Sequence, residues 1–139
     1  MSMYKIFDVA GSGLSAQTLR LNTIASNMAN AESVSGSEDT AYRARNPVFA
    51  AVFDQFSTPA NQATASVKVE GVVENEAPVM ASYEPNNPLA NEEGYVYRSN
   101  VNIAEEMANM ISASRSYQSN VEVMSTAKQL ILATLKLGQ

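Results

Sequence analysis

Residues 102–137 read NIAEEMANMISASRSYQSNVEVMSTAKQLILATLKL. Apolar side chains recur in this stretch at alternating steps of four and three, the spacing that keeps one seam of a helix facing a partner helix. The seam consists of Ile103, Met107, Met110, Ser114, Tyr117, Val121, Met124, Lys128, Ile131 and Leu135, with Ser114 and Lys128 as its polar departures. One helix of this length would span about 54 Å at 1.5 Å per residue, which is too long for a compact globule of 139 residues. The sequence therefore predicts an elongated molecule.

The ends of this helix carry the expected signals. Asn102 can cap the free amides at the start, Glu105 occupies the capping-box position three residues later, and Glu106 adds negative charge at the favourable end. Lys136 lies in the last turn and Gly138 just past the last apolar residue, as expected of a C-terminal stop.

A second heptad pattern predicts a helix over residues 3–30. Its seam consists of Met3, Phe7, Ala10, Leu14, Gln17, Leu21, Ile24 and Met28. Gly11 and Gly13 lie inside the pattern, and each costs about 1 kcal/mol relative to alanine, so the helix is weak on its own, although glycine also lets another backbone come close. The alternative is a frayed first turn before a helix that starts near Ser12 or Ser15.

Polar residues within the two helices have two readings each. Asn22, Asn27 and Asn30 either hydrogen-bond to neighbouring subunits or terminate the first helix before the turn-forming stretch 32–40, which predicts a flexible loop. The run of small polar residues at 112–120 either lets subunits approach closely or simply faces solvent. In the first reading, directional hydrogen bonds would come from Arg115, Gln118 and Asn120. The methionines are read as adaptable core residues.

The middle of the chain predicts a small, mostly antiparallel β unit. Residues 66–73 alternate apolar and polar side chains, and 79–83 and 95–97 are two further strand candidates. Turn positions are supplied by Pro78, Pro85, Pro88, Asn86, Asn87, Glu93 and Gly94. Residues 47–56 fit both a helical face and a strand, and we interpret them as an apolar anchor of undecided form. The predicted fold class is α+β, with an elongated, coiled-coil-like pair of N- and C-terminal helices and a β middle region.

Composition narrows the function. The chain is 45% hydrophobic and has no cysteine and no histidine, so disulfides, thiol chemistry and the commonest metal ligand are excluded. The net charge of −5 divides into +1 for residues 1–31, −6 for 32–99 and 0 for 100–139. An acidic middle argues against nucleic-acid binding. The first residues lack the pattern of a cleaved export signal, and no stretch is apolar enough to predict a membrane span.

No set of side chains predicts catalysis, a cofactor site or a metal site. The adjacent pairs Glu92-Glu93 and Glu105-Glu106 point in different directions if helical, and the second pair has a helix-capping explanation. The glycines of Gly11-Ser-Gly13 lack the rest of a dinucleotide fingerprint and do not follow a strand. We therefore expect a protein that is not an enzyme.

Several motifs carry a family resemblance. They are IFDVAGSGLSAQ at 6–17, ASNMANA at 25–31, YRARNPVFAAVF at 42–53, NIAEEMANMISASRSYQSNVEVM at 102–124 and TAKQL at 126–130. With these the whole chain resembles the bacterial flagellar basal-body rod protein family, most closely its C-type proximal rod members. The departure is ESVSG at 32–36, where other axial proteins have a threonine-glycine-tyrosine ending.

The resemblance implies a structural subunit of the periplasm-spanning proximal rod, exported unfolded by the flagellar type III apparatus. It implies that the helices of 1–31 and 100–139 pair in an inner layer, that 32–99 lies outside, and that partners are copies of the chain, other rod proteins, the export apparatus and the surrounding rings. The expected subunit-interface residues are Phe7, Leu14, Leu21, Ile24, Asn27, Met28, Asn30, Met107, Met110, Ser114, Arg115, Tyr117, Val121, Met124 and Ile131. The alternative is a self-contained two-helix secreted adaptor or export-cargo binding module, whose seams meet only each other.

Overall fold

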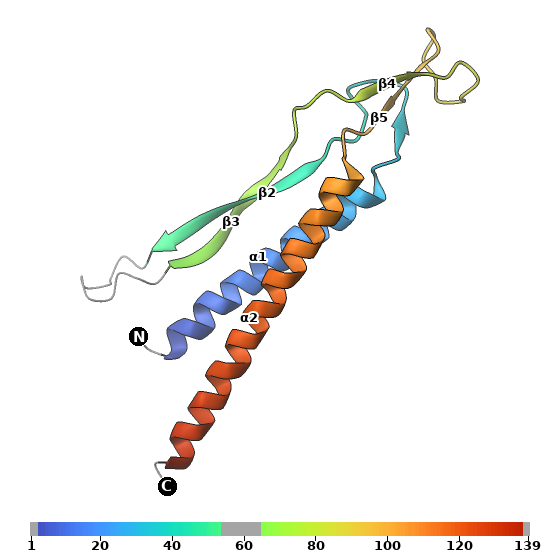
Figure 1. Ribbon diagram of the computed structural model, residues 1–139. Coiled ribbons are helices and arrows are strands. Elements are labelled where there is room, and N and C mark those ends of the chain that lie inside the picture. Colours follow the sequence, from blue (N-terminus) through green and yellow to red (C-terminus); the bar gives the residue numbers. More distant parts are fainter. Residues whose placement is uncertain (1–2, 54–64, 138–139) are drawn as a thin grey trace.

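Two long helices lie side by side and run in opposite directions (Figure 1). The structure is a computed structural model that describes residues 3–53 and 65–137, with only the backbone of Met3, Tyr4 and Leu137. Helix α1 covers Met3–Ala29 and α2 covers Ile103–Leu137. Both termini lie at the same end of an elongated molecule, where α2 extends past the start of α1 (Figure 1). The predicted helix pair is confirmed, and α1 begins at Met3 rather than near Ser12 or Ser15.

The helix ends follow from local polar chemistry. Asn102 Oδ1 accepts hydrogen bonds from the backbone amides of Ala104 and Glu105, at 3.1 and 3.4 Å, so the predicted N-cap of α2 is confirmed. At the end of α1, Asn30 Nδ2 donates to the carbonyl oxygen of Ser26 at 2.8 Å. Asn30 therefore satisfies one of the carbonyls that a helix leaves free at its end. Gly138, the predicted C-terminal stop, lies outside the described residues.

A long two-stranded sheet runs beside α1. Strand β2 (Arg45–Phe53) pairs antiparallel with β3 (Ala65–Glu74), and both contact α1. The backbone amide of Val67 donates to Ser12 Oγ at 3.1 Å, which ties β3 to the helix. The undecided stretch 47–56 is thus a strand as far as Phe53, because its backbone finds a partner strand, and Phe56 lies outside the described residues.

A second, three-stranded sheet lies at the other end of the helix pair (Figure 1). Its antiparallel order is β1 (Val34–Ser35), β5 (Tyr95–Arg98) and β4 (Met80–Tyr83). The strands predicted at 79–83 and 95–97 are confirmed. Strand β1 differs from the loop expected over 32–40, because two residues of that stretch pair with β5 without any alternating pattern of their own.

The buried apolar side chains are mostly small. They are Ala10, Ala16, Ile24, Ala41, Ala44, Val96, Ala113 and Ala127. Many larger apolar side chains remain exposed along α2 and both sheets. The described chain therefore brings its backbones close together with small residues and leaves much of its large apolar area on the surface, which in soluble proteins marks interaction sites.

Candidate functional site

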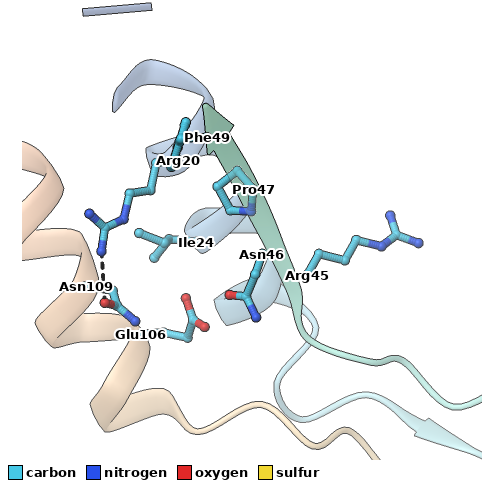
Figure 2. A pocket seen from close by; sticks show the side chains of 8 residues that line it. All are labelled: Arg20, Ile24, Arg45, Asn46, Pro47, Phe49, Glu106 and Asn109. Carbon is cyan, nitrogen blue, oxygen red and sulfur yellow. Dashed lines mark hydrogen bonds between the residues drawn. The ribbon is translucent and has the colours of Figure 1, made fainter. Parts of the chain in front are cut away.

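The contact between α1 and α2 is made of small and polar residues. Gly13 faces Asn120 so closely that a Cβ at Gly13 would lie 2.9 Å from Asn120 Nδ2. About two turns further along α1, Arg20 Nη2 donates to Asn109 Oδ1 at 3.1 Å (Figure 2). On α2 the buried Ala113 lies between these two points in sequence. Glycine and alanine let the backbones approach, and the polar pairs fix the register of one helix on the other.

Asn27 is the centre of a buried polar junction at the end of this contact. Its side chain is fully buried and makes four hydrogen bonds. Nδ2 donates to the Arg45 carbonyl oxygen at 2.8 Å and to Glu106 Oε1 at 3.2 Å, while Oδ1 accepts from the Arg45 amide at 2.9 Å and the Tyr42 hydroxyl at 3.0 Å. One amide side chain thus joins α1, α2 and the start of β2.

Glu106 is the charged member of the junction. It is 6% exposed, and its Oε2 is buried without a hydrogen-bond partner. Burial raises the pKa of Glu106 above the ordinary value of 4.5 and is the largest effect, while the hydrogen bond from Asn27 lowers it, the charge of Glu105 raises it and that of Arg20 lowers it. Burying an ionised carboxylate oxygen without a hydrogen bond is energetically unfavourable. A hydrogen-bond donor at Oε2, or protonation of the carboxylate, would remove this cost.

A cavity of about 350 Å³ opens beside Glu106, between α1, α2 and β2 (Figure 2). It is lined by Arg20, Ile24, Arg45, Asn46, Pro47, Phe49, Glu106 and Asn109. The walls supplied by Ile24, Pro47 and Phe49 are apolar, and Glu106 provides a carboxylate. Such a cavity can hold a side chain that has an apolar stem and a polar end.

The expected subunit-interface residues divide by exposure. Ile24 and Asn27 are buried within the chain. Met107, Arg115, Tyr117 and Val121 are exposed. The half-buried members are Phe7, Leu14, Leu21, Met28, Asn30, Met110, Ser114, Met124 and Ile131. Asn27 and Asn30 use hydrogen bonds within their own chain, and whether the others contact neighbouring subunits stays a prediction.

The exposed seam of α2 lies beside the face that meets α1. Glu106 and Asn120 contact α1, and Met107 and Val121 are the residues that directly follow them. Since each residue turns a helix by about 100°, Met107 and Val121 lie on the adjacent face of α2. Met107 is 52% exposed and Val121 43%. Two neighbouring stripes therefore run along α2, a small and polar one for α1 and a large apolar one that faces outward.

Sequence reasoning missed Glu106 as a buried group. It also missed Tyr42, which donates to Asn27, and the cavity residue Asn109. The available signal was that Glu106, Ala113, Asn120 and Ala127 recur every seven residues, as a series of small and polar positions beside the apolar seam. A heptad series of that kind indicates a close helix contact.

Neither a metal-binding cluster nor a membrane-spanning helix is found in the described part of the chain. No group of three or more acidic, cysteine or histidine residues within 3–53 and 65–137 is placed to hold a metal ion. Neither described helix is sufficiently apolar over its length to cross a bilayer. What the described residues offer is extended helical and sheet surface.

Two long helices with a small polar contact between them and a large apolar stripe facing outward define a structural subunit of a larger assembly. Two protein-family models indicate the same class. Residues 7–36 match the family model described as "Flagella basal body rod protein", and residues 92–137 match the family model described as "Flagellar basal body rod FlgEFG protein C-terminal". The chain is 51% identical over 139 residues to the flagellar basal-body rod protein FlgC of Salmonella typhimurium and to that of Yersinia enterocolitica, and 41% identical over 141 residues to that of Buchnera aphidicola, each match covering both chains in full.

The chain belongs to the flagellar basal-body rod protein family. The resemblance drawn from its motifs, including the C-type branch, is confirmed. Its function is that of a structural subunit of the flagellar basal-body rod.

Proposed function

We propose that this chain assembles through the apolar seams of α1 and α2 with copies of itself and with other rod proteins, and that torque passes along the rod through these contacts. The exposed apolar seam of α2 carries the proposal. Met107, Tyr117 and Val121 are large, exposed positions of the heptad seam, and an apolar stripe on a free surface marks a binding surface. The subunit has no catalytic role in this proposal.

The helix pair forms the inner layer of the rod, and the two sheets lie outside it. The acidic middle region, with its net charge of −6 over residues 32–99, then faces neighbouring subunits and the rings around the rod. The chain reaches this site through the flagellar type III export apparatus without a cleaved signal peptide. Gly11 and Gly13 support this route, because a helix weakened by glycine unfolds readily to pass a narrow channel and refolds when partners cover its seam.

Charged substitutions on the two seams test the proposal. Leu21→Glu on α1 and Val121→Glu on α2 each place a carboxylate in a contact that assembly would bury, and burial of an unpaired charge is strongly unfavourable. We expect both variants to be synthesised at normal levels and to be missing from isolated basal bodies, with loss of swimming. Gln129→Glu, on an exposed position of α2, is the control and should assemble normally. Normal incorporation of Leu21→Glu and Val121→Glu would reject the proposed surface.

The self-contained adaptor makes an opposite prediction for the isolated chain. Its helices would be fully formed and protected in a dilute monomer, because its seams would meet only each other. The rod subunit should gain helix and amide protection in residues 3–29 and 103–137 as concentration rises. Circular dichroism and hydrogen exchange across a wide concentration range separate the two, and the exposure of Met107 and Val121 favours the rod subunit.

A further inference from the structure

Two buried side-chain oxygens have no hydrogen-bond partner among the described residues, Gln17 Oε1 and Glu106 Oε2, and of the two only the Glu106 oxygen belongs to a group that can carry a charge. Asn27 occupies Oε1 at 3.2 Å, whereas Oε2 has no hydrogen-bond partner among the described residues. The residue is 6% exposed and lines the cavity of about 350 Å³ between α1, α2 and β2 (Figure 2). Buried polar groups in folded proteins are hydrogen-bonded as a rule, so an orphaned carboxylate oxygen beside an open cavity points to a donor that arrives on assembly.

Arginine is the side chain best suited to supply that donor. Its planar guanidinium is weakly hydrated and bonds a carboxylate in a charge-assisted way, and its stem can lie along apolar walls such as those of Ile24, Pro47 and Phe49. A lysine ammonium is more strongly hydrated and suits a buried pair less well.

Within the described residues, Arg115 is the one arginine without a hydrogen bond or an ion pair. Arg20 donates to Asn109. The other three form ion pairs, namely Arg43 with Glu38, Arg45 with Glu74 and Arg98 with Glu84. Arg115 is exposed on α2 and is flanked by Ser112, Ser114 and Ser116, whose short side chains let another surface come close. It lies nine residues from Glu106 on the same helix, roughly 13 Å along the axis, too far to reach its own Glu106.

We propose that Arg115 of a second copy of this chain enters the cavity and donates to Glu106 Oε2. The proposal rests on the proposed rod assembly and deepens it, because it assigns one pair of residues to one contact between copies. The pair joins a carboxylate oxygen without a hydrogen-bond partner to a guanidinium without one, both within the described residues, so that each copy both gives and receives one such bond. A head-to-tail contact of this kind, repeated from copy to copy, gives a ring or an open helix of copies.

Cross-linking tests the geometry. Because the chain has no cysteine, an introduced cysteine is its only reactive thiol. Asn46→Cys places one thiol at the cavity, and Ser112→Cys places one three residues from Arg115 on α2. The two single-cysteine variants, with different epitope tags, are expressed together in cells that assemble flagella, and basal bodies are treated with a short bismaleimide. We expect a product carrying both tags. Ser125→Cys, further along α2, replaces Ser112→Cys as the control and should give none.

Substitution tests the chemistry. Arg115→Ala and Glu106→Gln should each lower the amount of the chain in basal bodies by at least about tenfold, since truncating one partner of a buried charge pair is costly. Arg115→Ala combined with Glu106→Gln should lower it no further than either alone. Lys136→Ala removes one cation from the last turn of the same helix and should have no effect.

The outcomes distinguish this inference from the proposed function. Suppose that the wild-type chain enters basal bodies. If Arg115→Ala then assembles normally, or if the double variant loses the product of the two single losses in incorporation, the Arg115–Glu106 pair is rejected and the rod function stands. A cross-link from Asn46→Cys to a different rod protein, with none between copies, also rejects it. Absence of the wild-type chain from basal bodies would instead remove the proposed function itself.

Discussion

Replacing Asn27 by alanine should destabilise the chain by about 2–4 kcal/mol. The substitution removes four hydrogen bonds at once, two to the backbone of Arg45 and one each to Tyr42 and Glu106. A typical hydrogen bond contributes about 1 kcal/mol net to stability. Because Asn27 is fully buried, water molecules replace few of the hydrogen bonds that its side-chain amide made. Arg45 is exposed, so its backbone groups recover part of the loss from solvent, which sets the lower bound.

Urea unfolding followed by far-ultraviolet circular dichroism measures this loss. With a slope of about 2 kcal/mol per molar urea, the midpoint should fall by about 1–2 M. Asn22→Ala removes the same group from an exposed position of α1 and should change stability by less than about 0.5 kcal/mol. Tyr42→Phe keeps the aromatic ring but removes the hydroxyl that donates to Asn27 and accepts from Ser26, and it should cost about 1–2 kcal/mol. If Asn27→Ala and Tyr42→Phe both unfold at the midpoint of Asn22→Ala, the junction does not stabilise the fold.

Three further predictions concern the helix contact and the buried carboxylate. The new methyl group of Gly11→Ala meets no atom within 4 Å, so this variant should raise the free energy of unfolding in urea by about 1 kcal/mol. Gly13→Ala must displace the Asn120 side chain and should raise the free energy of unfolding clearly less. Equal increases for the two variants would contradict the close contact. Asn120→Ala should restore the missing gain when combined with Gly13→Ala, as read from the midpoints of the four chains. Because the pKa of Glu106 is raised in the folded chain, the stability that its proton adds is complete below the ordinary value of 4.5 and is lost as pH rises through the folded pKa. Unfolding from pH 4 to 8 should therefore show Glu106→Gln gaining on the wild type as pH rises, and a constant difference would be inconsistent with a buried, titrating carboxyl.

The helices and most strands could be predicted because their signals are local. Asn102 caps α2 through bonds to residues two and three positions away, and the seam of α2 repeats within its own sequence. Strand β1 could not be predicted, since Val34 and Ser35 are strand residues only by pairing with Arg98 and Tyr97. Two residues carry no periodicity, so only the partner strand defines them.

The site was predicted only in part for a similar reason. The heptad spacing indicates a helix contact but does not distinguish the stripe that meets α1 from the stripe that meets other subunits. Glu106 looks like an ordinary charge in the first turn of a helix, and its burial depends on Asn27, 79 positions earlier in the sequence. Contacts between distant segments decide such residues, and a single sequence does not display them.

The two stripes of α2 divide the work of the helix between folding and assembly. The small and polar residues of the contact between the helices, such as Gly13 and Asn27 on α1 and Glu106 on α2, contribute little stability by apolar burial. They permit one register of α1 on α2, because a shift would leave buried polar groups unpaired. The large side chains of Met107 and Val121 then stay available for partners, where burial of apolar area contributes roughly 25 cal/mol per Å². A chain that used its large residues for its own helix contact would fold more firmly alone and would have less apolar surface to offer a rod. Substitutions at the polar stripe should therefore change the stability of the chain, and those at the apolar stripe should change its assembly; Glu106 should affect both, because its proposed bond to Arg115 of a second copy belongs to assembly.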